Sequence, residues 1–163
     1  MPKLTHLDRS GSARMVDVSA KSLVRRRAVA SAEVRFNARA YRALRDARLA
    51  KGDALAVARL AAIQAAKRTS DWIPLCHTVP LDAVTVEIEL VDSTRTARVT
   101  TEAKTRWSTG VEMEALVAAS AACLALYDMA KALDRAIEIS GPRLLLKEGG
   151  RSGRYRRSGR RRR

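Results

Sequence analysis

The stretch VTVEIELVDSTRTARVTTEAKTRWSTGVEMEALVAASAACLALYDMAKALDR, residues 84–135, decides the fold class. Apolar and polar side chains alternate over residues 84–90, a pattern that predicts a strand with one wet face. The polar residues 92–94 predict a turn, and residues 96–107 predict a second strand, so the pair makes a hairpin. A Ser-Thr-Gly sequence then leads into a long helix over about residues 111–135.

Upstream of the hairpin, the pattern predicts one strand and two helices. Residues 28–36 alternate well enough to form the strand. Asn37 can cap a helix that ends near residue 49. Asp53 can cap a second helix over residues 54–67, which is apolar nearly all round and is therefore expected to be deeply packed.

Downstream of the long helix, residues 137–147 predict the last strand, with Gly141-Pro142 as an edge or bulge feature. With the doubled first helix counted once, the order of elements is the split β-α-β of a ferredoxin-like sandwich. We therefore predict an α+β fold in which an antiparallel sheet packs against helices. The chain divides into an N-terminal arm (1–26), a ferredoxin-like domain (27–153) and an Arg-rich disordered tail (154–163).

Composition and charge indicate a globular protein with an anionic ligand. The chain has 163 residues, 47% of them hydrophobic, and a net charge of +15. Eight arginines lie in residues 151–163, so residues 1–150 hold 24 basic against 17 acidic side chains, a net of +7. This remaining excess favours a ligand such as a polyphosphate. Aromatic residues make up only 4%, so small aliphatic side chains must form the core. Because the surface that such a core leaves over often meets another subunit, we expect an oligomer.

Several classes of protein are disfavoured. Two cysteines, Cys76 and Cys123, form neither a disulfide framework nor an iron–sulfur ligand set. The N-terminal residues 1–15 contain no apolar stretch typical of a signal peptide. The longest uncharged run, residues 115–127, is too short to cross a bilayer. We therefore expect a cytoplasmic protein without a membrane partner.

The long helix carries charged residues at both ends. Asp128 and Lys131 lie about 60° apart on one helical face, a spacing that is also typical of a surface ion pair. Glu112 and Glu114 stand at the other end, where carboxylates are favoured by the helix dipole. Glu114 and Asp128 are about 21 Å apart along the axis, too far for one small substrate to touch both. If both ends are functional, they serve different pockets or pockets shared with a neighbouring chain.

Three other segments are candidate anion sites. His77, beside Cys76 in a proline-flanked loop, can bind phosphate or transfer protons. Lys51 opens a helix whose free backbone N–H groups can receive an anion, although no phosphate-loop motif is present. The glycine-rich, basic residues 147–153 can fold over a phosphate chain or serve as a flexible linker. With only His6 and His77 and no adjacent acidic cluster, we expect no metal site.

Four stretches, residues 4–21, 51–77, 109–135 and 143–153, share specific strings with one family, among them IPLCH, GVEMEAL and YDMAKA in this order. By these stretches the chain resembles the cyclic pyranopterin monophosphate synthase (MoaC) family of molybdenum-cofactor biosynthesis. It departs from the family pattern at Ala62, where glycine is usual, at residues 78–80 after the loop histidine, and at Arg151, where lysine is usual.

The resemblance implies roles for eleven residues. The catalytic residues would be Asp128 as the acid–base group, with Lys51 and Lys131 beside it. The substrate-binding residues would be Leu75, Cys76, His77, Glu112, Met113, Glu114, Lys147 and Arg26.

The resemblance also implies a reaction and an assembly. The substrate would be (8S)-3',8-cyclo-7,8-dihydroguanosine 5'-triphosphate, supplied by a radical enzyme as functional partner. A phosphorus–oxygen lyase reaction would convert it to cyclic pyranopterin monophosphate and release pyrophosphate. No cofactor is expected; a Mg²⁺ ion on the pyrophosphate is compatible with this chemistry, although no motif requires one. The family assembles as a homohexamer, a trimer of dimers, with active sites at subunit interfaces.

Two other functions remain open from the sequence. The tail RSGRYRRSGRRRR can bind nucleic acid through charge alone, although the few aromatic residues are scattered and form no stacking platform. A catalytically silent scaffold in a cofactor-assembly complex would carry Lys51, His77, Asp128 and Lys131 without using them. Deletion of residues 154–163 discriminates, because an enzyme keeps its turnover whereas a nucleic-acid binder loses affinity.

Overall fold

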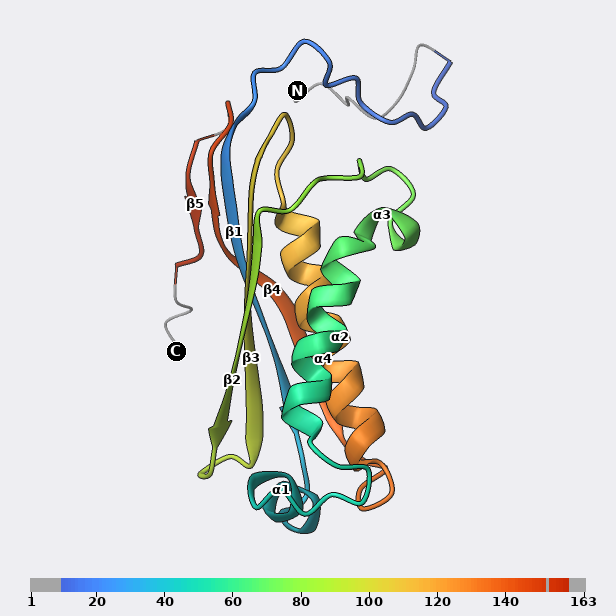
Figure 1. The fold of residues 1–163 in the computed structure, drawn as a ribbon, viewed down its shortest axis with the longest axis vertical. Coiled ribbons are helices and arrows are strands. Elements are labelled where there is room, and N and C mark those ends of the chain that lie inside the picture. Colours follow the sequence, from blue (N-terminus) through green and yellow to red (C-terminus); the bar gives the residue numbers. More distant parts are fainter. Residues whose placement is uncertain (1–9, 152, 159–163) are drawn as a thin grey trace.

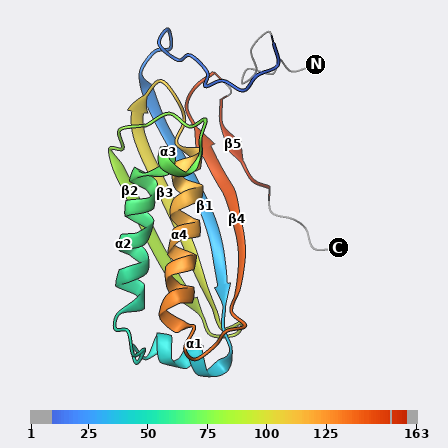
Figure 2. The same ribbon diagram turned by 90° about the vertical axis from the view of Figure 1, so that its right-hand side faces the viewer.

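Two long helices cover one face of an antiparallel sheet, and the core lies between these layers (Figures 1 and 2). The computed structural model describes residues 10–151 and 153–158. Its elements are β1 (Val24–Arg35), α1 (Ala38–Arg45), α2 (Ala54–Lys67), α3 (Thr69–Trp72), β2 (Ala83–Val91), β3 (Thr96–Trp107), α4 (Glu112–Ala130), β4 (Glu138–Glu148) and β5 (Tyr155–Arg156).

The strand order β2-β3-β1-β4-β5 confirms the predicted topology. All neighbouring strands pair antiparallel, and β1 lies between β3 and β4. Without β5, this is the arrangement of a split β-α-β sandwich, in which each crossing helix packs on the same face of the sheet. The register of β1 with β4 shifts between Ser31 and Glu33, opposite Gly141-Pro142, where the sequence predicted an edge or bulge feature.

Both predicted helix caps are present. The Asn37 side chain accepts a hydrogen bond from the backbone N–H of Ala40 at 2.8 Å. The Asp53 side chain accepts one from the N–H of Ala56 at 2.9 Å. Each cap satisfies an N–H group that the first turn of a helix leaves free, so α1 and α2 begin where the sequence predicts.

The long helix ends earlier than predicted. We expected it to run to about residue 135, but α4 ends at Ala130. The carboxylate of Asp134 accepts hydrogen bonds from the backbone N–H of Asn37 at 2.6 Å and of Ala136 at 3.0 Å. These bonds tie the loop after α4 to the start of α1, and they take the place of further helical turns.

Alanine allows the two layers to approach closely. Fully buried alanines on β1, at residues 28, 30 and 32, lie in the same core as fully buried alanines of α4, at residues 115, 118, 119 and 122. The hydroxyl of Thr101 on β3 donates to the carbonyl of Ala115 at 2.7 Å, and Thr101 is fully buried. Small side chains between the layers and this buried hydrogen bond therefore hold α4 close against the sheet.

The outer surface of the helix layer differs from the prediction for α2. That helix was expected to be deeply packed, yet Leu60 is 62% exposed and Val57 is 41% exposed. Leu124 of α4 is 51% exposed. The buried residues of α2 and α4 are mainly alanines, so the larger side chains Val57, Leu60 and Leu124 lie on the outer side of the two helices. We call Val57, Leu60 and Leu124 the helix-layer patch.

By length and composition alone, α4 is apolar enough to cross a membrane, but 61% of its most apolar 18-residue window is buried inside the fold. It packs against α2 and against three strands of the sheet. Its burial is that of a core helix.

The ends of the domain also differ from the prediction. Strand β1 begins at Val24, so the last residues of the predicted arm belong to the sheet. Within the predicted tail, Tyr155 and Arg156 form β5 on the free edge of β4, and the N–H of Arg157 donates to the carbonyl of Leu145 at 2.8 Å. The unpaired backbone groups of an edge strand explain this pairing. The predicted tail residues 159–163 and the arm residues 1–9 lie outside the described residues.

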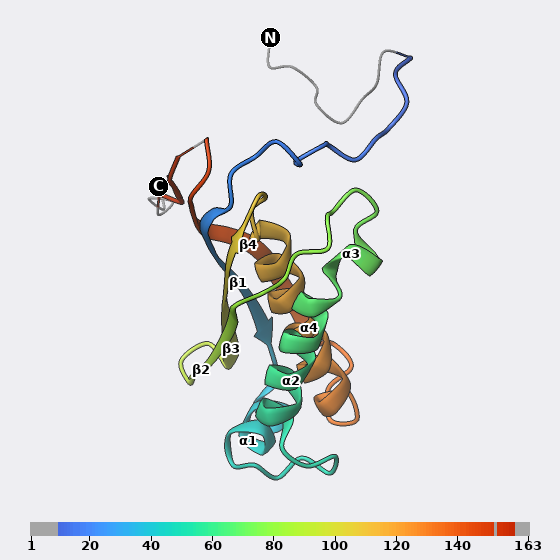
Figure 3. The ribbon, with the colours of Figure 1, turned by 45° about the horizontal axis from the view of Figure 1, so that its top comes forward.

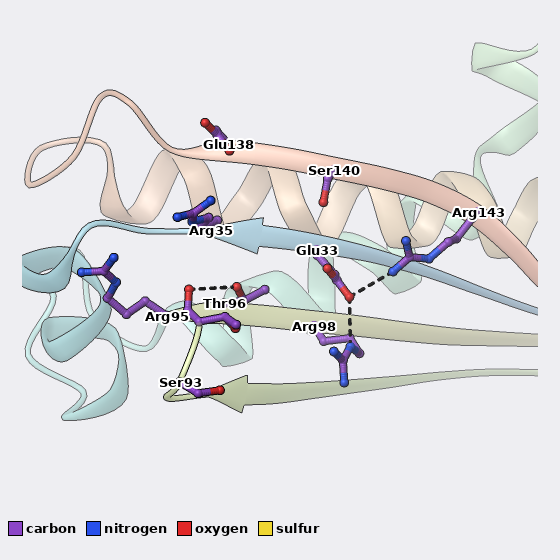
Figure 4. Close-up of a pocket in the computed structure, with 10 residues that line it drawn as sticks. Glu33, Arg35, Ser93, Arg95, Thr96, Arg98, Glu138, Ser140 and Arg143 are labelled. Carbon is purple, nitrogen blue, oxygen red and sulfur yellow. Dashed lines mark hydrogen bonds and ion pairs between the residues drawn. The ribbon is translucent and has the colours of Figure 1, made fainter. Parts of the chain in front are cut away.

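The sheet face opposite the helices carries ion pairs that connect neighbouring strands. Glu33 lies 3.0 Å from both Arg98 and Arg143, and Arg98 also pairs with Glu89 at 3.1 Å. Glu33, Arg98 and Arg143 line a cavity of about 680 Å³, in which both arginines point at Glu33 (Figure 4). None of the eleven predicted site residues lines this cavity.

The position of β5 changes the expected effect of deleting the tail. A chain ending at Ser158 keeps β5, and its stability should equal that of the full chain. A chain ending at Gly153 loses β5 and the Arg157–Leu145 hydrogen bond, and should be about 1–3 kcal/mol less stable. Urea unfolding of the two chains measures the difference. Equal stability of the two shortened chains would show that β5 does not stabilise β4. If the chain that ends at Ser158 bound RNA more weakly than the full chain, the nucleic-acid alternative would be favoured.

Candidate active site

Lys51, Asp128 and Lys131 form one cluster at the C-terminal end of α4. The Lys51 ammonium lies 2.6 Å from Oδ2 of Asp128 and also donates to the Asp128 backbone carbonyl at 2.9 Å. The Lys131 ammonium lies 2.6 Å from Oδ1 of the same carboxylate. The single Asp128 carboxylate therefore joins two lysines that are far apart in the sequence.

Lys51 reaches this point because α2 runs antiparallel to α4, so the start of α2 lies beside the end of α4 (Figure 1). Between Lys51 and the helix, Gly52 turns the chain with a φ of 92°, a conformation that favours glycine. Asp53 then caps α2. The turn and the cap together fix the backbone that carries Lys51.

The two lysines fix the charge of Asp128. The hydrogen bond from Lys131 and then that from Lys51 lower the pKa of Asp128 to about 2, and Asp128 in turn raises the pKa of Lys131. All three side chains are about half exposed. Near neutral pH the cluster therefore holds one carboxylate between two ammonium groups, a net positive charge that can face an anionic ligand.

At the opposite end of α4, a cavity of about 440 Å³ brings together six of the predicted residues; we call it the Glu114 cavity. Its wall consists of Leu75, Cys76, His77 and Val79 from the loop after α3, Thr109, Gly110, Glu112, Met113 and Glu114 from the start of α4, and Val16, Val18 and Lys21 from the N-terminal arm. Figure 3 shows the arm crossing this end of the molecule.

Glu114 is the most deeply buried acid of this cavity, with 4% of its surface exposed. Burial, and to a smaller extent the charge of Glu112, raise the pKa of Glu114 to about 7. No ion pair neutralises it within residues 10–151 and 153–158. Burial, together with Glu114, also raises the pKa of the Cys76 thiol, so Cys76 is a neutral thiol near pH 7. The cavity can thus hold a proton on Glu114 close to neutrality.

An adjoining cavity of about 650 Å³ contains Arg26 and Lys147; we call it the Arg26 cavity. The Arg26 guanidinium donates to the carbonyls of Trp107 at 3.3 Å and Ser108 at 3.1 Å. A Cβ atom added at Gly150 would collide with this guanidinium, and the positive φ of Gly150 also favours glycine there. The ammonium of Lys147, which is buried, donates to the carbonyl of Gly153 at 3.1 Å.

The structure therefore divides the predicted site into two parts. Eight predicted substrate-binding residues line the two adjoining cavities at one end of α4. The three predicted catalytic residues lie at the other end of the helix, about 21 Å away along its axis. Neither of these two cavities is lined by Lys51, Asp128 or Lys131.

Sequence reasoning did not assign Lys21, Arg25, Thr109 or Gly110 to the site, although all four line the Arg26 cavity. The signal for the arm was weak, since the sequence there reads as polar and irregular, with Met15, Val16 and Val18 among its few apolar residues. In the part of the chain that the structure describes, no group of three or more His, Cys, Asp or Glu side chains could hold a metal ion.

Comparison with known proteins gives a consistent result. The profile of the MoaC family matches residues 15–150. A cyclic pyranopterin monophosphate synthase from Cereibacter sphaeroides is 52% identical over 155 residues, 95% of this chain and 98% of that protein. A protein of the same name from Heliobacterium modesticaldum has the same identity and coverage. One from Bordetella petrii is 51% identical over 155 residues, 95% of this chain and 96% of that protein.

The raised pKa of Glu114 predicts a stability that depends on pH. The unfolded chain releases this proton near pH 4.5, whereas the folded chain keeps it until about pH 7, so stability falls as the pH rises between these values. The variant Glu114→Gln lacks this loss and should be more stable than the parent at pH 8, by up to about 3 kcal/mol. The difference should shrink as the pH falls toward 5.

Urea unfolding at pH 5 and pH 8 measures this effect, with Glu87→Gln, an exposed acid on β2, as the control. The same pH dependence in Glu114→Gln and the parent would contradict the role of burial at Glu114.

Proposed function

Because the chain belongs to the MoaC family, we propose that it is a cyclic pyranopterin monophosphate synthase. It converts (8S)-3',8-cyclo-7,8-dihydroguanosine 5'-triphosphate to cyclic pyranopterin monophosphate and releases pyrophosphate, a phosphorus–oxygen lyase reaction. The observation that carries the proposal is the Lys51–Asp128–Lys131 cluster, present in the same chain as one cavity suited to a purine base and one suited to phosphates.

The two cavities suit different parts of this substrate. The Glu114 cavity has a partly apolar wall, including Leu75, Val79 and Met113, which fits a purine ring. Arg26 and Lys147 in the Arg26 cavity fit the negative charge of the triphosphate and of the departing pyrophosphate. His77, in the wall of the Glu114 cavity, would bind substrate as well.

Proton transfer during ring opening and closure is the task of the charged cluster. The ammonium groups of Lys51 and Lys131 are the proton donors of the cluster. The Lys131 ammonium loses its proton more readily once the Asp128 carboxylate no longer faces it, because Asp128 raises its pKa. With a pKa of about 2, Asp128 is a weak base in the free protein, so its first role is to hold both lysines in place. It accepts a proton once a lysine has turned to the substrate.

A second copy of the chain would unite the two parts of the site. A two-fold axis crossing α4 near its middle exchanges the ends of the helix. The Lys51 cluster of one copy would then face the Glu114 cavity of the other. The exposed helix-layer patch offers apolar surface for such a contact. This arrangement agrees with the proposed homohexamer, a trimer of dimers with active sites at the subunit interfaces.

The remaining parts of the proposal concern the cellular context. A radical enzyme supplies the cyclised nucleotide, and both proteins act in the cytoplasm. The chemistry rearranges bonds and expels pyrophosphate without net redox change, so no redox cofactor is part of it. A Mg²⁺ ion on the pyrophosphate group is compatible with this chemistry, although no motif requires one.

A turnover assay tests the proposal. Purified protein is incubated with the cyclised dihydro-GTP, and pyrophosphate and pterin are followed. The parent should turn over, and Asp128→Ala and Lys51→Ala should lose at least about 100-fold in kcat with unchanged oligomer size. Lys104→Ala, which removes a lysine paired with Glu102 on the other face of the sheet, is the matched control.

No pyrophosphate from the parent would overturn the proposed function. Normal turnover in Asp128→Ala or Lys51→Ala would remove the catalytic role from that residue alone.

A further inference from the structure

Lys21 stands at the junction of the two cavities. Four residues line both the Glu114 cavity and the Arg26 cavity, namely Lys21, Thr109, Gly110 and Glu112. Of these four, Lys21 is the cation. It also lines a third cavity of about 690 Å³, which runs along the arm beside His77 and Trp107.

Two local hydrogen bonds fix the backbone of the arm at this point. The N–H of Ser19 donates to the Asp17 carboxylate at 2.9 Å, and the N–H of Lys21 donates to the carbonyl of Val18 at 3.0 Å. These bonds form a tight turn that sets the direction from which Lys21 enters the cavities. Val16 and Val18, which are half-buried in the wall of the Glu114 cavity, hold the turn against the domain.

The Lys21 side chain is exposed, and no ion pair or side-chain hydrogen bond engages its ammonium among the described residues. Lys51 and Lys131, by contrast, are both paired with Asp128. Lys21 is therefore a cation at the site with no protein anion to neutralise it, so an anionic ligand can take it up without first breaking an ion pair.

We propose that Lys21 is a further substrate-binding residue, which contacts the phosphate group nearest to the nucleoside. The inference rests on the proposed function. If the base occupies the Glu114 cavity and the terminal phosphates occupy the Arg26 cavity, the first phosphate must cross the junction that Lys21 lines. Glu112 lies at the same junction, and Lys21 offsets the repulsion between this carboxylate and the phosphate.

This position matters for the closing step of the reaction. A hydroxyl oxygen of the substrate forms a bond to the first phosphorus, and the bond from that phosphorus to the bridging oxygen breaks. The electron pair leaves with pyrophosphate, and the hydroxyl proton passes to a basic group of the site. An ammonium at the first phosphate stabilises the charge on its oxygens during this exchange.

Equilibrium binding of GMP and GTP tests the assignment. Lys21→Ala should raise the Kd of both nucleotides by about tenfold, because both carry the first phosphate. Lys147→Ala should raise the Kd of GTP by much more than that of GMP, because its cavity receives the terminal phosphates. Lys21→Arg should restore most of the affinity. Arg14→Ala removes a charge from the same arm outside the three cavities and is the matched control.

An effect of Lys21→Ala on GTP alone, or an effect no larger than that of Arg14→Ala, would overturn the assignment. The outcome is separable from the proposed function. If Lys21→Ala weakens the binding of both nucleotides but the parent releases no pyrophosphate from the cyclised substrate, the proposed function is wrong and the Lys21 assignment stands. If the parent turns over the substrate but Lys21→Ala binds both nucleotides as tightly as the parent, the Lys21 assignment is wrong and the proposed function stands.

Discussion

The antiparallel packing of α2 against α4 determines where the Lys51 cluster lies and how far it is from the Glu114 cavity. Alanines at the inner surface of both helices let them approach closely. The start of α2 therefore meets the end of α4, which brings Lys51 to Asp128. The loop after α3 meets the start of α4 for the same reason, which brings His77 to the cavity of Glu114. This packing therefore positions the Lys51 cluster and the loop wall of the Glu114 cavity, and it keeps them a helix length apart.

The two parts have opposite electrostatic character. At one end, exposed ammonium groups lower the pKa of Asp128 to about 2. At the other end, burial raises the pKa of Glu114 to about 7. Acids whose environments move their pKa values in opposite directions are typical of sites that both donate and accept protons near neutral pH. A site formed from both ends would have fixed charges on one side and a titrating group on the other.

Local patterns in the sequence predicted most of the fold. Alternation predicted β2 and β3, and the side chains of Asn37 and Asp53 predicted the starts of α1 and α2. The end of α4 was missed because it depends on hydrogen bonds of Asp134 to a distant loop.

The candidate site was predicted less completely, because its parts are distant in the sequence. The pair of Asp128 and Lys131 followed from helical spacing. The link from Lys51 to Asp128 came only from the family resemblance, since 77 residues separate the two. The arm residue Lys21 has no local signal, because only the folded chain brings it to the cavities.

The central claim is that a complete site needs two copies of the chain. Co-expression of Lys51→Ala with His77→Ala tests it directly, since each variant alone damages every site. If sites form between two-fold related chains, half of randomly formed dimers are mixed and one site in each mixed dimer carries neither substitution, so about a quarter of the parental turnover should return. A mixture no more active than the separate variants would contradict the claim.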